Sequence, residues 1–282
     1  MNIRFITDSA SDMIYGERED VSFLPLGVAF GDRFYQDGVD LSHQEFYEKL
    51  VEGDSLPTTS QISPAAFEDC FRRVQESGEI GIAVTMSGKL SGTYQSACIA
   101  AEEFPGTIYV VDSEQVTIGE RCLIEYGLKL KEQGMSAPEI VEALEREKKN
   151  IHLVALLDTL EYLKRGGRIS RTAALAGGLL SIKPVVSVED GEVKVIGKAR
   201  GSKQGNNLLV QEIGKAGGVD FQRPYFLGYT GLSDALLQKY IQDSAALWEG
   251  QAEQLEGHSV GAAIGTHAGP GAVAVAFFAK EN

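Results

Sequence analysis

Two short runs that are apolar on both faces constrain the fold of this chain more than any other feature. Residues 80–84 read Ile-Gly-Ile-Ala-Val and residues 108–111 read Ile-Tyr-Val-Val, so polar and apolar side chains do not alternate along either run. Strands of this kind are typical of a parallel sheet that helices cover on both faces. Further strands are predicted at residues 3–6 and 23–30, and helices at residues 42–51, 64–76, 93–104 and 116–133. The first half therefore predicts an open α/β/α domain with a mainly parallel sheet, which binds ligands beyond the carboxyl ends of its strands.

The second half has a different layout. It predicts a hairpin at residues 185–196, helices at residues 202–215 and 233–248, strands at residues 259–265 and 272–278, and a loop at residues 266–271. This pattern is typical of an α+β domain with a mixed or antiparallel sheet. We expect one domain at residues 1–158 and a second at residues 159–282, with the ligand in the groove between them.

The charge balance excludes two classes of partner. The chain has 26 basic and 40 acidic side chains, which gives a net charge of −14. Nucleic acids and anionic membranes repel such a surface, and counterion release needs clustered Lys and Arg. The longest apolar runs are far shorter than the ~18 residues that a membrane span needs. We therefore expect no nucleic-acid partner, no stable membrane insertion and, because the N-terminal residues show no signal-peptide pattern, a soluble cytoplasmic protein.

The spacing of cysteine and histidine gives no support for a metal site. The 3 cysteines are widely spaced, and the 4 histidines form no His-Glu-x-x-His pair. Buried reduced thiols fit this pattern better than disulfides or a zinc site. The chain also has no Gly-x-x-x-x-Gly-Lys-Ser/Thr, and no Gly-x-Gly-x-x-Gly follows a predicted strand. We expect neither a metal nor a cofactor.

Two clusters of hydroxyl residues precede predicted helices. Residues 85–93 read Thr-Met-Ser-Gly-Lys-Leu-Ser-Gly-Thr and follow the third strand, whereas residues 57–64 read Pro-Thr-Thr-Ser-Gln-Ile-Ser-Pro. Donors at a helix N-terminus favour an anion, although helix capping is the simpler explanation of either cluster alone. Two such clusters in one α/β layer favour a shared anion site. Because the nucleotide-binding patterns are missing, the anion is expected to differ from a nucleotide phosphate.

Basic and histidine residues of the second half are further candidates. His267 lies in the predicted Gly/Pro-rich loop, where a packing role is harder to assign than on a helix face. Arg200 lies where a predicted strand ends and a helix begins. Either could also be an ordinary surface residue. Residues 163–171 carry four cations in an otherwise acidic chain, which indicates either a solvated loop or a surface that steers an acidic partner.

Six segments taken together resemble the DegV family. In chain order they are residues 6–12 (ITDSASD), 57–61 (PTTSQ), 91–97 (SGTYQSA), 112–113 (DS), 162–169 (YLKRGGRI) and 265–271 (GTHAGPG). Each motif is weak alone, but the ordered set is specific and spans nearly the whole chain. The family comprises fatty-acid-binding proteins, including the acyl-carrying subunit of the bacterial two-component fatty acid kinase. The resemblance implies a non-catalytic protein that holds a long-chain fatty acid in a buried tunnel. An ATP-dependent kinase subunit would phosphorylate the presented carboxylate to an acyl phosphate.

The resemblance also implies which residues form the site. The hydroxyls that bind the carboxylate fall on Thr59 or Ser60 and on Ser91, and the family's loop histidine matches His267. Arg200 would be the basic residue on the C-terminal side of the site. The cationic run would lie near the mouth and could meet the kinase through Lys164, Arg165, Arg168 and Arg171. The fatty acid is the only ligand implied, with no metal or cofactor.

Two alternatives stay open at this point. A stand-alone hydrolase or acyltransferase would use Ser91 as nucleophile, His267 as base, and Asp112 or Asp8 to orient the base. The Gly-x-x-Ser-Gly spacing at residues 88–92 misses the Gly-x-Ser-x-Gly nucleophile elbow by one position, which argues against this reading. The second alternative is a small-molecule sensor with no transfer role.

Overall fold

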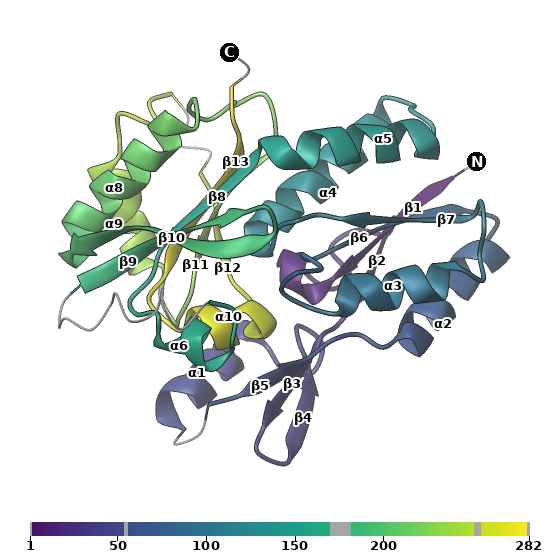
Figure 1. Cartoon of the computed structure of the whole chain (residues 1–282), viewed down its shortest axis with the longest axis horizontal. Helices are drawn as coiled ribbons and strands as arrows, with labels where there is room; N and C mark the ends of the chain where they lie inside the picture. The colour runs from purple at the N-terminus through teal and green to yellow at the C-terminus, as the bar shows by residue number, and fades with distance from the viewer. Residues whose placement is uncertain (1, 54–55, 170–181, 251–254, 281–282) are drawn as a thin grey trace.

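The structure is a computed structural model that describes residues 2–53, 56–169, 182–250 and 255–280. Within these ranges two larger sheets lie beside each other, and a small sheet lies below them in the view of Figure 1. Short helical segments lie between the longer elements: η1 (Ser9–Ser11) follows β1 (Ile3–Asp8), η2 (Lys148–Asn150) precedes β8 (Ile151–Leu156), and α6 (Glu161–Arg165) follows β8.

The first sheet is the parallel sheet predicted for the first half. Its strands run in the order β2-β1-β6-β7, and every neighbouring pair is parallel. The strands are β1 (Ile3–Asp8), β2 (Val21–Leu24), β6 (Ile80–Thr85) and β7 (Ile108–Asp112). Helices α2 (Pro64–Glu76) and α3 (Thr93–Ala101) lie on one face, and α4 (Thr117–Glu132) and α5 (Ala137–Glu147) lie on the other (Figure 1). This covering on both faces buries the neighbours Ile82 and Ala83, which point to opposite faces of β6, as the apolar run predicts, and confirms the open α/β/α layout.

The second sheet is the mixed sheet expected for the second half. Its strands run in the order β10-β9-β8-β13-β11-β12, and neighbours are antiparallel except for the parallel pair β11 and β12. The strands are β8 (Ile151–Leu156), β9 (Ile182–Glu189), β10 (Glu192–Arg200), β11 (Tyr225–Tyr229), β12 (Gly257–Ser259) and β13 (Val273–Phe278). Helices α8 (Gly201–Lys215) and α9 (Ala235–Asp243) pack on one face of it (Figure 1). The predicted hairpin is confirmed, and Asp190 and Gly191 form its two-residue turn with φ of 50° and 76°.

A small antiparallel sheet in the first half is not predicted by the sequence. It has the order β4-β3-β5, with β3 (Gly27–Phe30), β4 (Arg33–Gln36) and β5 (Thr58–Ser60), and α1 (His43–Glu52) lies nearby. Residues 23–30, expected as one strand, are divided between β2 and β3, which belong to different sheets. Pro25 lies at the division, and proline cannot donate a hydrogen bond to a strand ladder. The cluster at residues 57–64, expected as a turn, supplies β5, in which Thr59 pairs with Val28.

The prediction of a strand at residues 259–265 is wrong. β12 ends at Ser259, and α10 (Ala262–Ala268) follows it, so His267 lies in a helix and not in a loop. The start of α10 is buried, with Ala262 fully inaccessible. A short helix that is buried on most sides has apolar residues all round, and periodicity cannot distinguish it from a strand.

Helix α4 joins the two larger sheets. It contacts β1 and β6 of the first sheet and β8, β11 and β13 of the second. The same hydrophobic core includes Phe5 of β1 and Phe278 of β13. β8 precedes residue 158, where we expect the domain boundary, yet it pairs with β9 and β13 in the second sheet. The division into residues 1–158 and 159–282 stays a prediction.

The packing of α4 against β1 predicts the effect of a substitution at Gly127. A Cβ at this position would lie 2.7 Å from the Phe5 ring and 3.3 Å from Leu144 Cδ2. Gly127→Ala should therefore lower the free energy of unfolding by about 1–2 kcal/mol, because overpacking outweighs the gain in helix propensity. Gly214→Ala is the matched control, because Gly214 is exposed in α8 and a Cβ at this position would have no neighbouring atom within 4 Å. Urea unfolding should show the control stabilised, and equal stabilisation of Gly127→Ala would contradict this account.

Candidate functional site

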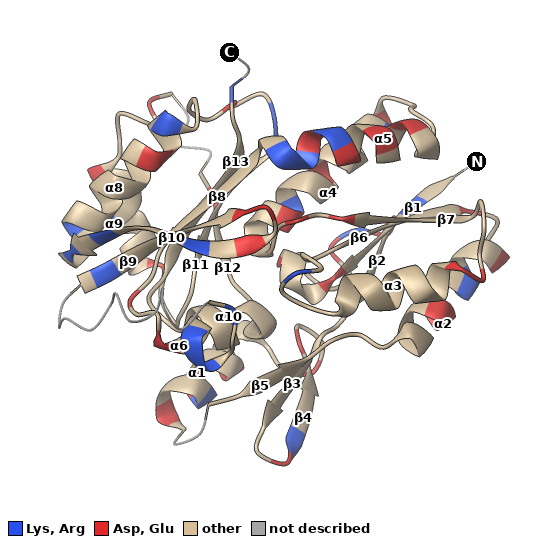
Figure 2. Ribbon diagram, in the orientation of Figure 1, with Lys and Arg blue, Asp and Glu red and all other residues tan. Residues whose placement is uncertain are grey.

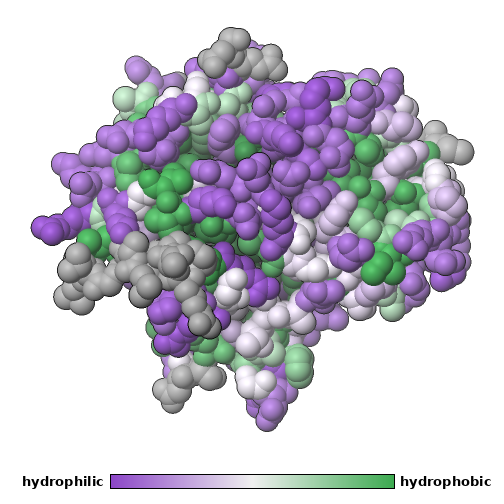
Figure 3. All heavy atoms as spheres, in the orientation of Figure 1, coloured by the Kyte–Doolittle hydropathy of each residue, from purple (hydrophilic) through white to green (hydrophobic). Residues whose placement is uncertain are grey.

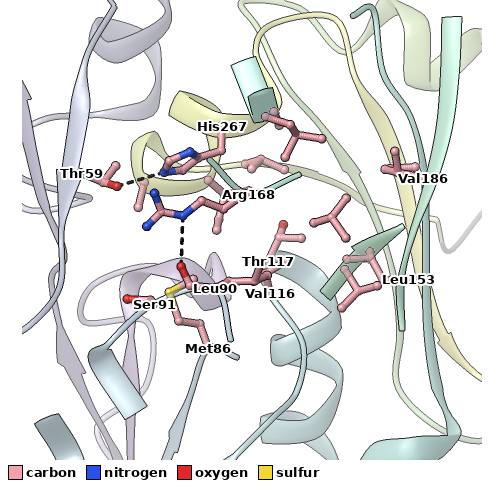
Figure 4. Close-up of a pocket in the computed structure, with 18 of the residues that line it drawn as sticks. Thr59, Met86, Leu90, Ser91, Val116, Thr117, Leu153, Arg168, Val186 and His267 are labelled. Carbon is pink, nitrogen blue, oxygen red and sulfur yellow. Dashed lines mark hydrogen bonds between the residues drawn. The ribbon is translucent and has the colours of Figure 1, made fainter. Parts of the chain in front are cut away.

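A cavity of about 410 Å³ lies between the two larger sheets. Its walls come from the second sheet, from β5 and the loop after β6, from the start of α4, and from α10 (Figure 4). Most of the lining is apolar: Leu26, Met86, Leu90, Val116, Leu153, Ala155, Leu157, Leu163, Val186, Val188, Val193, Val260, Ala263, Ile264, Ala268, Ala272 and Ala274. A cavity of a few hundred Å³ with an apolar lining is typical of a small-molecule site.

Strand alternation gives the cavity an apolar floor. Ala274 of β13 pairs with Ala155 of β8, and Ala155 also pairs with Val186 of β9, so the three residues form one row across the sheet. All three line the cavity. Their strand neighbours Val154 and Val275 belong to the core on the other face of the sheet, under α8 and α9. Because two alanines stand side by side, this part of the cavity stays open.

Thr59, Ser91, Arg168 and His267 lie at one end of the cavity (Figure 4), which we call the polar end. The lining also includes Thr117, Ser187 and Thr230. Thr59 Oγ1 lies 3.0 Å from His267 Nε2, within hydrogen-bonding distance. Ser91 Oγ lies 2.9 Å from Thr93 Oγ1 and accepts the backbone N–H of Thr93 at 3.2 Å. These side chains come from β5, from the loop before α3, and from α10. Three segments far apart in the sequence thus supply one polar end.

His267 is a neutral imidazole. Burial, with a smaller contribution from the Arg168 guanidinium, lowers the pKa of His267 from 6.5 to about 4. Among the described residues, its Nδ1 has no hydrogen-bond partner. Gly166 packs against this side of the ring, and a Cβ at position 166 would overlap Nδ1. His267 is therefore uncharged near neutral pH, and Nε2 is its hydrogen-bonding atom.

Arg168 borders the same end of the cavity. Its Nε donates to the Leu90 carbonyl oxygen at 3.1 Å, and its Nη1 donates to the Gly166 carbonyl oxygen at 2.6 Å. These bonds tie the loop after β6 to the segment after α6. Arg168 is predicted from the sequence to belong to a docking surface, whereas in the structure its half-buried side chain is part of the cavity wall.

The structure brings most of the predicted carboxylate-binding residues together. The cavity lining includes Thr59, Ser60, Ser91 and His267. Arg200 is exposed at the last position of β10, and it does not line this cavity. Val193 is the residue of β10 that does, and a strand rise of about 3.3 Å per residue puts Arg200 roughly 20 Å further along. The direction of β10 thus carries Arg200 away from the polar end.

The other predicted docking residues lie on the surface or outside the described ranges. Lys164 and Arg165 are exposed on α6, which is coloured blue by basic residues in Figure 2. Arg165 pairs with Glu161 at 2.7 Å. Arg171 lies outside the described residues. Hydrophilic residues also dominate the face shown in Figure 3 over α5, where acidic and basic residues are mixed.

The hydrogen bonds do not form the arrangement that a serine hydrolase needs. His267 Nε2 faces Thr59, and the hydroxyl of Ser91 faces Thr93. Asp112, one candidate to orient the base, instead accepts the backbone N–H groups of Gly88 and Glu114. Asp8, the other candidate, accepts those of Ala10 and Met86. Neither carboxylate orients the imidazole.

Gln61 is a lining residue that the sequence analysis does not single out. Its Nε2 donates to Ser96 Oγ at 3.0 Å, which fastens β5 to the start of α3. A Cβ at Gly92 would overlap the Gln61 amide, so a larger residue there would force the Gln61 side chain out of this position. The sequence feature that could have indicated this contact is Gly92 in Ser-Gly-Thr at residues 91–93, because helix capping by Ser91 or Thr93 does not need a glycine between them.

Two properties of the described residues bear on cofactors and membranes. No His, Cys, Asp and Glu side chains in these ranges form a group of three or more that could bind a metal ion. The helices in the same ranges include none with the length and apolar character to span a bilayer.

Comparisons with known proteins identify relatives over the whole chain. A family model described as "Uncharacterised protein, DegV family" matches residues 2–280. A DegV domain-containing protein of Caldanaerobacter subterraneus is 36% identical over 287 residues, which covers 99% of both chains. A solved structure that describes fatty acid binding by a DegV family protein of Thermus thermophilus has 33% identity and a TM-score of 0.87, and covers 99% of this chain and 100% of that one. The fatty acid kinase B3 protein of Streptococcus pneumoniae, solved loaded with linoleic acid, has 25% identity and a TM-score of 0.84, and covers 99% of this chain and 100% of that one.

The buried state of His267 predicts a pH dependence of stability. The unfolded chain binds a proton at a pKa of about 6.5 and the folded chain at about 4, so stability should fall as the pH decreases between these values. The full difference corresponds to on the order of 3 kcal/mol. His267→Gln removes this titration, so its urea-unfolding free energy should fall less over the same pH range. Other groups titrate in both proteins and cancel in the difference, and a difference that does not vary with pH would refute the assignment.

Proposed function

This chain belongs to the DegV family, and on that basis we propose that it holds a long-chain fatty acid in the cavity and presents the carboxylate to a partner kinase. The observation that carries the proposal is the polarity of the cavity: a mostly apolar lining with Thr59, Ser91, Arg168 and His267 together at one end. A fatty acid has the same division between tail and head group. The related proteins described as fatty-acid-binding or loaded with linoleic acid support this ligand class.

The apolar interior would supply the affinity for the tail. Each buried methylene contributes about 0.8 kcal/mol, so a long chain supplies several times the affinity of any one polar contact. The row of Ala155, Ala274 and Val186 gives the tail a smooth wall without polar groups. The tail therefore lies along the second sheet, and the head group lies at the polar end.

The polar end would satisfy the carboxylate with neutral donors. A buried carboxylate without hydrogen bonds would cost several kcal/mol or take up a proton. When His267 Nε2 carries its proton, it donates to Thr59 Oγ1, and the Thr59 hydroxyl is then free to donate to a carboxylate oxygen. Ser91 is the second hydroxyl donor, and the exposed Ser60 also lines the cavity. These side chains are the carboxylate-binding residues of the proposal, and Arg168 replaces Arg200 as the nearby cation.

The transfer step itself would occur on the partner's nucleotide. A carboxylate oxygen attacks the γ-phosphorus of ATP bound to the kinase, a carbon–oxygen–phosphorus linkage forms, and ADP leaves with the electrons of the broken bond. This chain supplies no group to the broken bond and acts by holding the nucleophile in place. It is therefore the lipid-binding subunit of a two-component fatty acid kinase, and because ATP is the donor, the cytoplasm is the proposed location.

The basic surface of α6 would receive the kinase. Lys164 and Arg165 are exposed there in a chain with a net charge of −14, and Arg168, three residues on, reaches the cavity wall. A local surface of opposite sign steers an acidic partner toward the end of the cavity where the carboxylate lies. The docking role of Lys164, Arg165 and Arg168 is part of the same proposal.

Lipid analysis and reconstitution test the proposed function. Mass spectrometry of lipid extracted from the freshly purified protein should detect one fatty acid per chain. With ATP and a fatty acid kinase, the loaded protein should form an acyl phosphate that hydroxylamine traps, and the protein alone should form none. Unassisted turnover with labelling by a serine-reactive probe would favour the hydrolase, and binding without any transfer would favour the sensor.

Substitution of Ser91 tests the polar end. Ser91→Ala should weaken retention of the fatty acid by about three- to tenfold, because one hydrogen bond to the head group is lost. Ser63→Ala is the matched control: Ser63 Oγ caps α2 by accepting the Ala66 N–H at 3.3 Å, as Ser91 Oγ accepts that of Thr93, but it does not line the cavity. The rate of fatty acid release to acceptor vesicles measures the effect. Equal release rates for the two variants would exclude Ser91 from the site.

Substitution of Arg165 tests the docking surface. Arg165→Ala should raise the KM of the kinase for the loaded protein about two- to fivefold at low salt, with fatty acid retention unchanged. Lys215→Ala is the control, since Lys215 also pairs with a glutamate of its own helix, Glu212 at 2.6 Å. Steady-state kinetics at two ionic strengths should show the Arg165 effect shrinking with salt. An unchanged KM, or an equal change in the control, would remove α6 from the docking surface.

A further inference from the structure

Two carboxylates from the first half of the chain bind the N-terminus of α10. Gly261 N donates to Asp12 Oδ1 at 2.7 Å. Asp37 accepts two further amides, since Ala262 N donates to its Oδ1 at 2.9 Å and Ala263 N donates to its Oδ2 at 3.0 Å. Asp12 and Asp37 are only 3% and 1% exposed. Hydrogen bonds from backbone amides to a buried carboxylate are among the stronger ones in proteins, and negative charge is favourable at this end of a helix.

The same small sheet holds both ends of α10. Asp37 directly follows β4 and binds the start of the helix, whereas Thr59 of β5 binds His267 in the last turn. Ser9 Oγ donates to Asp37 Oδ2 at 3.0 Å, which fixes the carboxylate from a third side. A helix as short as Ala262–Ala268 has little stability of its own, so its place depends on these contacts.

The surroundings of Asp37 favour its ionised form against the burial that raises its pKa. The amides of α10, the hydroxyl of Ser9 and the neighbouring His43 of α1 all act in this direction. Asp12 is set in a similar way, with the hydroxyl of Thr117 and the guanidinium of Arg121 facing it. Neither carboxylate is part of the cavity lining, so the ligand does not account for their burial.

We propose that Asp37, supported by Asp12, is a positioning residue that determines where His267 Nε2 lies at the polar end of the cavity. The proposal rests on the proposed function only for its effect on fatty acid retention. Without the carboxylate, the first turn of α10 loses two acceptors, the helix shifts from the small sheet, and His267 becomes more exposed and less well aligned with Thr59.

The test compares Asp37→Asn with Asp32→Asn in the full chain. Asp32 lies exposed in the turn between β3 and β4, so its substitution makes the same change of charge without touching α10. NMR titration of the His267 ring in lipid-free protein should show its pKa rising from about 4 toward 6.5 in Asp37→Asn and staying unchanged in Asp32→Asn. Retention of a fatty acid should fall about tenfold in Asp37→Asn alone.

A folded Asp37→Asn protein whose His267 titrates as in the wild type overturns the proposal, even if its melting temperature falls. If Asp37→Asn does not fold, Asp12→Ala takes its place, because it removes the acceptor of Gly261 N at the same end of α10. A folded Asp12→Ala protein whose His267 titrates as in the wild type also overturns the proposal. The titration needs no ligand. If the wild-type protein retains no fatty acid, the proposed function is wrong. The ring titration of His267 then still decides whether Asp37 positions His267.

Discussion

The packing of α4 against both larger sheets determines where the cavity lies. The helix is buried on nearly every side, and it contacts β1 and β6 on one side and β8, β11 and β13 on the other. A helix with its side chains is about 10–12 Å wide, so it holds the two sheets apart by that much. Helix α4 begins at Thr117, and Val116 and Thr117 line the cavity. The cavity is therefore the space between the sheets that the helix does not reach, and it results from the packing of layers more than from the conformation of loops.

Buried carboxyl groups near the end of β1 organise the loops that carry the polar residues. Asp8 accepts the backbone N–H of Met86 at 2.9 Å and so fixes the loop that leads to Ser91. Asp12 accepts the N–H of Gly261 before α10. Burial raises the pKa of both carboxyl groups to about 7, although the hydrogen bonds that they accept act in the opposite direction. Backbone amides that point at them offset this cost, so the loops of the site are fastened to β1 and do not depend on the ligand to bring them together.

The sequence predicts the parts of this fold whose signal is local. The two-sided apolar runs identify β6 and β7, and the Glu-Asp-Gly turn identifies the β9–β10 hairpin. The resemblance places Thr59, Ser91 and His267 in one site, and the structure brings them to one end of a cavity. The helix α10 escapes prediction because the acceptors of its first amides lie more than two hundred positions away in the sequence. The sequence also does not predict that Arg168, and not Arg200, lines the cavity. The distance of Arg200 from the cavity depends on the direction of β10, and that of Arg168 depends on the path of the chain after α6, and no local sequence pattern determines either.

The charge at the polar end suits the proposed function, in which the protein both retains a fatty acid and presents it for transfer. Arg168 donates two of its five N–H groups to backbone carbonyl oxygens, which fixes the guanidinium in the cavity wall as a source of positive charge. His267 is neutral, and the remaining donors are hydroxyls. Under the proposed function, a carboxylate held in this way keeps a lone pair directed toward the opening, whereas a bidentate ion pair would occupy both oxygens and lower their nucleophilicity. Retention then depends mainly on the apolar tail, and reactivity depends on how weakly the head group is bound.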